Sequence, residues 1–172
     1  MGNRTPATGV AVITGGAAGI GEAIARRLSA DRFAVVVADL DGNRADEIAT
    51  EISAHGGQAA GRQVDISAAE SVAALFGWLT HDLGRCDVLV NNAGIAATAT
   101  LSGLPLEQWN STMAVNVTGA LLMTQHAIPL MKKGGRGRIV NISSISGVRA
   151  SAEGLLTEPP KPRSSGSPDS WR

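Results

Sequence analysis

The stretch that decides the fold reads Thr14-Gly15-Gly16-Ala17-Ala18-Gly19-Ile20-Gly21, and it follows a β-branched run over residues 10–13. A helical pattern over residues 22–30 comes after it. Strand, glycine turn and helix in this order are how many proteins bind the pyrophosphate of a dinucleotide, because the helix N-terminus offers unpaired N–H groups and about half a positive charge. Gly15 is expected to allow the tight turn, Gly19 the approach of the phosphates, and Gly21 close packing of the helix on the strand. A plain strand–helix turn is the alternative.

The composition is that of one globular domain with balanced charge. The 172 residues are 44% hydrophobic and carry 15 basic and 15 acidic side chains. Zero net charge without a basic run argues against a nucleic-acid partner, and no apolar run is long enough to span a bilayer. The single cysteine, Cys86, excludes an internal disulfide and favours a reducing compartment. We therefore expect a cytoplasmic protein with no membrane partner and no metal site.

Strand and helix patterns alternate along the chain. Apolar runs predict strands over residues 10–13, 33–38, 58–66, 86–90 and 137–143. Helical spacing predicts helices over residues 22–30, 44–55, 68–83 and 105–131. This alternation favours an α/β fold, a doubly wound parallel sheet of the Rossmann type with helices on both faces. Right-handed crossovers predict five strands in the order 3-2-1-4-5.

A carboxylate follows the second predicted strand. Asp39 lies 18 residues after Gly21, where a carboxylate can accept hydrogen bonds from both hydroxyls of an adenosine ribose. Its charge would repel the 2′-phosphate of NADP, and the glycine turn holds no Lys or Arg to counter that repulsion. The sequence therefore predicts NAD as the preferred cofactor. Asp41 is an alternative for part of this role, and a solvated strand-end aspartate is the simplest alternative.

Further segments, in order along the chain, resemble the short-chain dehydrogenase/reductase family in its TGxxxGxG and NNAG branch. They are Gln-Val-Asp-Ile at residues 63–66, Leu-Val-Asn-Asn-Ala-Gly at 89–94, the segment from Trp109 through Val-Asn-Val-Thr-Gly at 115–119, and Gly-Arg-Ile-Val-Asn-Ile-Ser-Ser at 137–144. The resemblance runs from about Gly9 to Gly154. It implies an NAD(P)-binding domain over residues 1–156, incomplete at its C-terminus, and hydride transfer between nicotinamide and a small secondary alcohol or ketone. It also implies a homodimer or homotetramer for an intact relative.

The resemblance assigns roles to residues at the matching positions. Ser144 would bind the substrate carbonyl and stabilise the developing oxyanion, and Ser143 is its rival, although alternation along a strand would turn it to the opposite face. Asn116 would hold a water of the proton relay through a backbone bend, and an ordinary helix-interior asparagine is the alternative. Asp65 would hold the adenine, and Asn91 would also steady the sheet. The residues expected to bind the cofactor are Thr14, Gly15, Gly19, Ile20, Gly21, Asp39, Asp65, Ile66, Asn91, Ala93 and Gly94.

The family's catalytic Tyr-x-x-x-Lys pair has no counterpart in this chain. The sequence contains no tyrosine, and the position thirteen residues after Ser144 is Thr157, four residues before Lys161. In the family the tyrosine hydroxyl exchanges a proton while hydride moves, and a threonine hydroxyl is a far weaker acid. Three prolines within residues 157–162 also oppose the helix that would bring the two positions together. The chain as written is therefore expected to lack its general acid/base.

Residues 157–172 differ in composition from the rest of the chain. They hold four of the seven prolines, several serines and almost no apolar side chains, which is typical of a disordered, non-family tail. With permitted synonymous codons, reading one nucleotide earlier gives Tyr-Arg-Ala-Ala-Lys-Ala-Ala-Val-Val-Gly-Leu, a Tyr-x-x-x-Lys segment at the family position. A one-nucleotide frame shift near codon 157 is our hypothesis, and a natural truncation or a diverged end are the alternatives. An oxidoreductase and an inactive dinucleotide-binding fragment both remain open.

Overall fold

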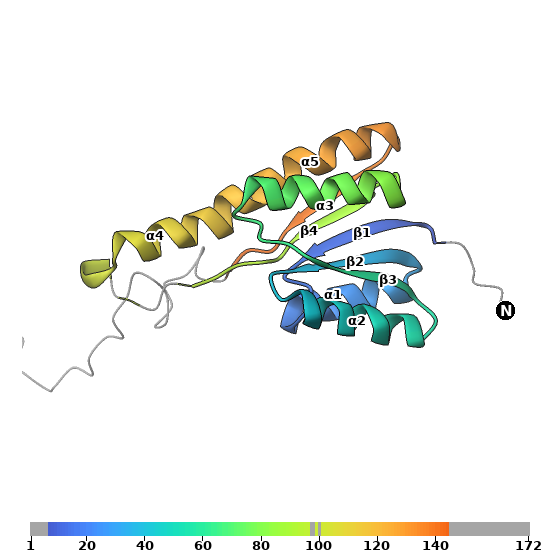
Figure 1. The fold of residues 1–172 in the computed structure, drawn as a ribbon, viewed down its shortest axis with the longest axis horizontal. Coiled ribbons are helices and arrows are strands. Elements are labelled where there is room, and N and C mark those ends of the chain that lie inside the picture. Colours follow the sequence, from blue (N-terminus) through green and yellow to red (C-terminus); the bar gives the residue numbers. More distant parts are fainter. Residues whose placement is uncertain (1–6, 97–98, 100, 145–172) are drawn as a thin grey trace, which may run out of the picture.

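The structure is a computed structural model that describes residues 7–96, 99 and 101–144. Its strands are β1 (Gly9–Thr14), β2 (Phe33–Asp39), β3 (Gln58–Gln63), β4 (Val88–Asn91) and β5 (Arg138–Asn141). They form one parallel sheet in the order β3-β2-β1-β4-β5 (Figure 1). The predicted strand order is confirmed. The predicted tail at residues 157–172, with Thr157 and Lys161, lies outside the described residues.

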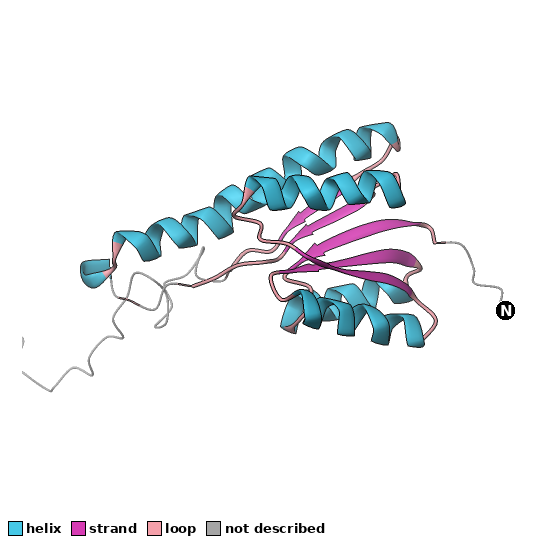
Figure 2. Ribbon diagram, viewed as in Figure 1, coloured by secondary structure: helices cyan, strands magenta, loops and turns pink. Residues whose placement is uncertain are grey.

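Helices cover both faces of the sheet (Figure 2). Helices α1 (Gly19–Ala30) and α2 (Gly42–Ala54) lie on one face, and α3 (Ala69–Asp82) and α5 (Ala120–Lys133) lie on the other. Helix α4 (Leu106–Met113) follows a short 3-10 turn and leads into α5 through a π-helical segment, Ala114–Gly119. The doubly wound architecture predicted from the alternating patterns is confirmed.

The two helical layers are fixed by the alternation of side chains along the buried strands. Val10 and Val12 pack in the cluster that includes α3 and α5, whereas Ala11 and Ile13 pack in the cluster that includes α1 and α2. Strand β1 is therefore buried on both faces along its whole length. A parallel strand covered on both sides needs apolar residues at every position, which is why this segment reads as a continuous apolar run.

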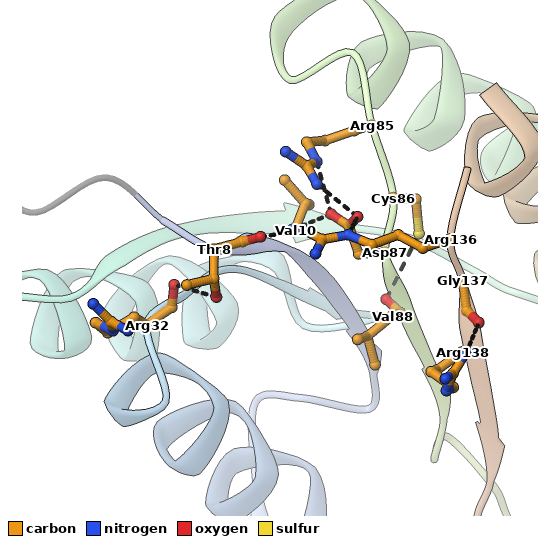
Figure 3. A network of polar contacts seen from close by, with 10 residues as sticks. All are labelled: Thr8, Val10, Arg32, Arg85, Cys86, Asp87, Val88, Arg136, Gly137 and Arg138. Atoms are coloured by element: carbon orange, nitrogen blue, oxygen red, sulfur yellow. Dashed lines mark hydrogen bonds and ion pairs between the residues drawn. The ribbon is translucent and has the colours of Figure 1, made fainter. Parts of the chain in front are cut away.

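The amino ends of three strands are tied together by a buried carboxylate (Figure 3). Asp87 is 5% exposed; it accepts the N–H of Val10 at 2.7 Å and pairs with Arg85 at 2.7 Å and Arg136 at 2.9 Å. Burial alone would raise the pKa of Asp87, but the hydrogen bonds from Arg85, Val10 and Arg136 outweigh it and hold the pKa below its usual range. Burial and the charge of Asp87 raise the pKa of the neighbouring Cys86 thiol to about 12, which makes this thiol unreactive.

Several element ends differ from the sequence-based expectation. The strands predicted over residues 58–66 and 137–143 end earlier, at Gln63 and Asn141. Each ends opposite the last residue of its partner strand, Asp39 for β3 and Asn91 for β5, so no further ladder is available. The single helix predicted over residues 105–131 is divided by the π-helical segment, which a periodic apolar pattern does not reveal.

Candidate functional site

The glycine turn lies at the carboxyl end of β1, the edge of an open α/β sheet where ligands bind. Gly15 has φ +62° and Gly19 has φ +54°, left-handed conformations that favour glycine. A Cβ at Gly19 would meet nothing within 4 Å, so the space before the N-terminus of α1 is open. A Cβ at Gly21 would collide with the carbonyl oxygen of Gly15 and lie 2.6 Å from Asn92 Nδ2. A close approach at Gly21 is therefore made to the turn that follows β1 and to Asn92. Close packing of the helix on the strand itself stays a prediction.

Thr14 and Asn92 hold this turn against the end of β4. Thr14 Oγ1 accepts the N–H groups of Asn92 at 3.0 Å and Ala93 at 3.1 Å and donates to the carbonyl of Val90 at 3.3 Å. Asn92 Nδ2 donates to the carbonyls of Thr14 at 3.0 Å and Gly15 at 3.1 Å. The Thr14 side chain is buried and serves this frame. Sequence reasoning did not select Asn92, although its place in the Asn-Asn-Ala-Gly motif was the available signal.

Asp39 lies beside the glycine turn, as the sequence predicts. Its Oδ2 accepts the N–H of Ala17 at 3.0 Å, and its Oδ1 accepts the N–H of Asp41 at 3.1 Å. A carboxylate oxygen has a second lone pair, so both oxygens can still accept a ribose hydroxyl. Asp41 instead caps α2 by accepting the N–H of Arg44 at 3.0 Å. The structure therefore gives the two aspartates different tasks.

Asp65 and Ile66 follow the carboxyl end of β3, at the same edge of the sheet as the glycine turn. Asp65 Oδ1 accepts the N–H of Ser67 at 2.9 Å and its hydroxyl at 2.6 Å, and the Asp65 N–H donates to Ser71 Oγ at 3.0 Å. These bonds shape the turn into α3. Ile66 is buried, and a Cβ at Gly119 would lie 2.8 Å from its side chain, so the π-helical segment packs tightly here.

A cavity of about 730 Å³ lies between the ends of β4 and β5 and the helical segment that leads into α5. The predicted site residues that line this cavity are Thr14, Ile66, Asn91, Ala93, Gly94, Asn116 and Ser144. Ser143, the rival of Ser144, lines it as well. The other predicted residues are outside this lining: Gly15, Gly19, Ile20, Gly21, Asp39 and Asp65. Every described residue that lines the cavity is uncharged. Amides and hydroxyls of this kind can bind and orient a ligand, but they do not supply a general acid or base near neutral pH.

Asn91 joins three elements at the base of the cavity. Its Nδ2 donates to Asn141 Oδ1 at 2.8 Å on β5 and to Thr124 Oγ1 at 3.2 Å on α5. Its carbonyl accepts the N–H of Ile142 at 2.9 Å. Asn91 Oδ1 is buried and has no hydrogen-bond partner among the described residues. Asn91 therefore steadies the sheet, and it also offers a buried acceptor at the cavity; sequence reasoning missed Thr124 and Asn141.

Asn116 clamps the loop that follows β4. Its Oδ1 accepts the N–H of Ile95 at 2.9 Å, and its Nδ2 donates to the carbonyl of Ile95 at 2.8 Å. The residue lies in the π-helical segment, so the backbone departs from an α-helix at this position. Both bonds cross to the loop after β4, so the side chain is satisfied by its protein surroundings, and an ordinary structural asparagine stays an alternative. A relay water at Asn116 stays a prediction.

Ser143 and Ser144 both follow the end of β5, line the cavity and are exposed. Because β5 ends at Asn141, strand alternation does not rank the two serines. The described residues contain no group of three His, Cys, Asp or Glu side chains placed to hold a metal ion. Within that same part of the chain, each helix is too short or too polar to cross a bilayer.

Comparison with known proteins places this geometry among dehydrogenases. The model of the short chain dehydrogenase family matches residues 9–155. A 3-oxoacyl-[acyl-carrier-protein] reductase of Synechocystis sp. is 39% identical over 81% of this chain and 57% of the relative. D-threitol dehydrogenase of Mycolicibacterium smegmatis is 37% identical over 78% of this chain and 52% of the relative. The chain spans just over half the length of these two relatives.

A solved structure gives the same result for the fold. The crystal structure of a metagenomic short-chain oxidoreductase in complex with NADP matches with a TM-score of 0.81 and 37% sequence identity. The match covers 87% of this chain and 68% of that chain.

Proposed function

The chain belongs to the short-chain dehydrogenase family, and from this premise we propose that it derives from an NAD-dependent oxidoreductase that moves hydride between nicotinamide and a secondary alcohol or ketone. One observation carries the proposal: the glycine turn, Asp39 and the uncharged cavity meet at one edge of the sheet. The turn would hold the pyrophosphate, and the cavity beside Asn91 and Ser144 would hold the nicotinamide and the substrate. When bound, the cofactor supplies the hydride chemistry.

The preference for NAD over NADP rests on Asp39. Its carboxylate accepts a bond from Ala17 inside the glycine turn, which supports the proposal that its negative charge would repel the 2′-phosphate of NADP. The related crystal structure holds NADP, so the preference needs a direct test. We expect NADH to bind the chain at least about tenfold more tightly than NADPH. Equal affinities would contradict this preference.

Two variants make that test specific. Asp39→Ser removes the charge beside the turn and is expected to bring the NADH and NADPH affinities together. Asp41→Ser removes the same charge two residues away, where the carboxylate caps α2, and should leave the preference unchanged. Serine is chosen because it can still cap a helix, so α2 is kept intact in the control. Both affinities are measured by the fluorescence of the reduced nicotinamide.

Within the cavity, Ser144 is proposed to bind the substrate carbonyl and Asn116 to position the relay beside it. Both Ser143 and Ser144 are exposed on the cavity lining, and the position in the family motif favours Ser144. The clamp on Ile95 supports a positioning role for Asn116. The described lining holds no group able to exchange a proton near pH 7. We therefore propose that the chain as written binds the dinucleotide without turnover.

The missing acid/base pair is proposed to lie in the neighbouring reading frame from codon 157. Two facts support a change of frame: the family match ends at residue 155, and the sequence holds no tyrosine. The test begins with the nucleotide sequence of the gene from about codon 144 onward. An open neighbouring frame that starts with tyrosine and lysine codons supports the proposal, and a closed frame favours the binding module.

The decisive experiment compares the 172-residue chain with the protein made in the neighbouring frame. Both are expected to bind NADH, and only the second is expected to reduce small ketones. In that protein, Ser144→Ala should lower kcat by about 10²–10³-fold, whereas Ser143→Ala is the matched control that should retain activity. Loss of activity in the Ser143 variant alone would reverse the assignment. Failure of the 172-residue chain to bind NADH would contradict the proposed cofactor site.

We further propose a cytoplasmic location and, for the protein in the restored frame, a homodimer or homotetramer. The sequence holds a single cysteine and so no internal disulfide, which supports the first proposal. Exposed apolar side chains along α4 support the second: Leu106 is 72% exposed, Trp109 is 42% exposed and Met113 is 38% exposed.

A further inference from the structure

A second cavity lies away from the glycine turn, where α1 and α2 end and β2 and β3 begin. Its volume is about 480 Å³, within the range of small-molecule sites. We propose that it binds a small monocarboxylate with an apolar body. The residues that carry this inference are Ser29, Arg32, Phe33, Ile52, His55 and Gln58.

Arg32 is held in an unusual backbone conformation at this cavity. Its φ is +67°, and every other described residue with a positive φ is a glycine. Its carbonyl accepts the N–H and the hydroxyl of Thr8 at 2.9 and 3.2 Å (Figure 3). Its N–H donates to the carbonyl of Ser29 at 2.9 Å. Glycine would adopt this conformation without strain, so the backbone alone gives no reason for an arginine here. Strained residues of this kind cluster at ligand sites.

The guanidinium of Arg32 is exposed and has no acidic partner in the part of the chain that the structure describes. It makes no hydrogen bond or ion pair with any residue that the structure describes. The neighbouring arginines are paired instead, Arg26 with Glu22 at 2.9 Å and Arg27 with Asp31 at 3.0 Å. One unpaired guanidinium suits one negative charge, and its planar fork matches a carboxylate through two parallel hydrogen bonds. This selects a monoanion over a polyanion.

The remainder of the lining suits an apolar body beside that carboxylate. Ile52 is buried and Phe33 is half-buried, so the cavity has an apolar wall. Ser29 Oγ and the Gln58 amide have no side-chain hydrogen bond within the described part of the chain and can add donors to the carboxylate. His55 Nδ1 lies 2.7 Å from the carbonyl of Glu51, which engages one ring nitrogen and leaves Nε2 available.

The test titrates the 172-residue chain with octanoate and follows backbone amide resonances by NMR. We expect saturable shifts centred on Arg32, Gly56 and Gly57, with acetate at least about tenfold weaker because it lacks the apolar body. Arg32→Gln should weaken octanoate binding at least about tenfold. Arg27→Gln is the matched control: it removes the same charge from a residue that does not line the cavity, and it should bind octanoate as the natural chain does.

A second variant separates loss of the site from loss of the fold. Arg32→Gly removes the guanidinium and also relieves the positive φ, so it should unfold at a higher temperature while losing octanoate binding. Four results would overturn the proposal. They are no saturable shift up to about 20 mM octanoate, binding that survives both Arg32 substitutions, shifts centred on the cavity at Asn91, and inorganic phosphate binding more tightly than octanoate.

Discussion

Gly21 has no Cβ, and this allows it to pack against Gly15 and Asn92 in the glycine turn. A Cβ there would collide with the carbonyl oxygen of Gly15 and approach Asn92 Nδ2 to 2.6 Å. Both neighbours belong to one hydrogen-bonded frame, so neither can yield without breaking the bond between them. We predict that Gly21→Ala lowers the free energy of unfolding by about 1–3 kcal/mol and weakens NADH binding at least about tenfold. Chemical denaturation and fluorescence titration measure the two effects.

The control for this substitution is a glycine that has room for a side chain. Gly77 lies within α3, and a Cβ there would meet nothing within 4 Å. Gly77→Ala should therefore raise the free energy of unfolding by about 0.5–1 kcal/mol, since alanine favours a helix. A Gly21→Ala protein as stable as the natural chain, with unchanged NADH affinity, would show that the turn accommodates a methyl group.

Asp87 makes the stability of the chain depend on pH. Its pKa is lower in the folded chain, so the stabilisation is complete above the unfolded value of about 3.9 and is lost as pH falls through the folded value. We predict that Asp87→Asn lowers the free energy of unfolding at pH 7 by about 2 kcal/mol, because the carboxylate holds a buried backbone N–H and two guanidinium groups. Urea unfolding at several pH values tests this. A deficit that stays constant down to about pH 2 would contradict the assignment.

At the scale of elements, local pattern predicts a strand or helix well and its end poorly. The middle of β2 is visible as an apolar run, and the buried face of α2 is visible in the spacing of Ala45, Ile48 and Ile52. The end of β5 is set by where its neighbour β4 stops, and no residue of β5 encodes that. The π-helical segment contains Asn116, whose side chain bonds to Ile95, 21 residues away in the chain, and such a partner is not visible in a local pattern.

The residues of the candidate site also fall into those that a local motif reveals and those that it does not. Gly15 and Gly19 can be recognised within one short motif because their conformations are local. The bonds of Asn92 to Thr14 join residues 78 positions apart, and the bond of Asn91 to Asn141 joins residues 50 positions apart. Such partners become apparent only when the sheet order brings the strands together.

The clamp formed by Asn116 gives a prediction at this scale. Asn116→Ala removes both bonds to the backbone of Ile95, so that loop should open more readily. We expect the Ile95 amide to exchange with solvent at least about tenfold faster, which corresponds to the loss of about 1.4 kcal/mol. Hydrogen exchange followed by NMR measures the rate.

The matched control is Asn110→Ala on α4, an exposed asparagine whose side chain has no hydrogen bond in the described region. Exchange at Ile95 should be unchanged in that variant. If the two variants behave alike, the clamp does not hold the loop.

For the whole molecule, the two edges of the sheet differ in character. Strand β3 at one edge carries polar residues, among them Gln58, Arg62 and Gln63. Strand β5 at the other edge exposes apolar side chains: Ile139 is 37% exposed and Val140 is 45% exposed. Among the described residues, no strand pairs with the outer side of β5. An apolar edge with unpaired backbone groups is a template for another strand, whereas charged and polar edges discourage pairing. Self-association is therefore expected at β5.

We predict that the 172-residue chain associates in a concentration-dependent way and that Val140→Lys reduces this association. A lysine on the edge keeps the strand in place but makes pairing of two copies costly, because like charges would be brought together. Sedimentation velocity across a range of concentrations measures the monomer fraction. Thr50→Lys adds the same charge at an exposed position on α2, away from the edge, and should leave association unchanged. If both lysine variants reduce association equally, the effect is due to net charge. If the natural chain is monodisperse and unfolds in one cooperative thermal transition, β5 does not act as an open edge.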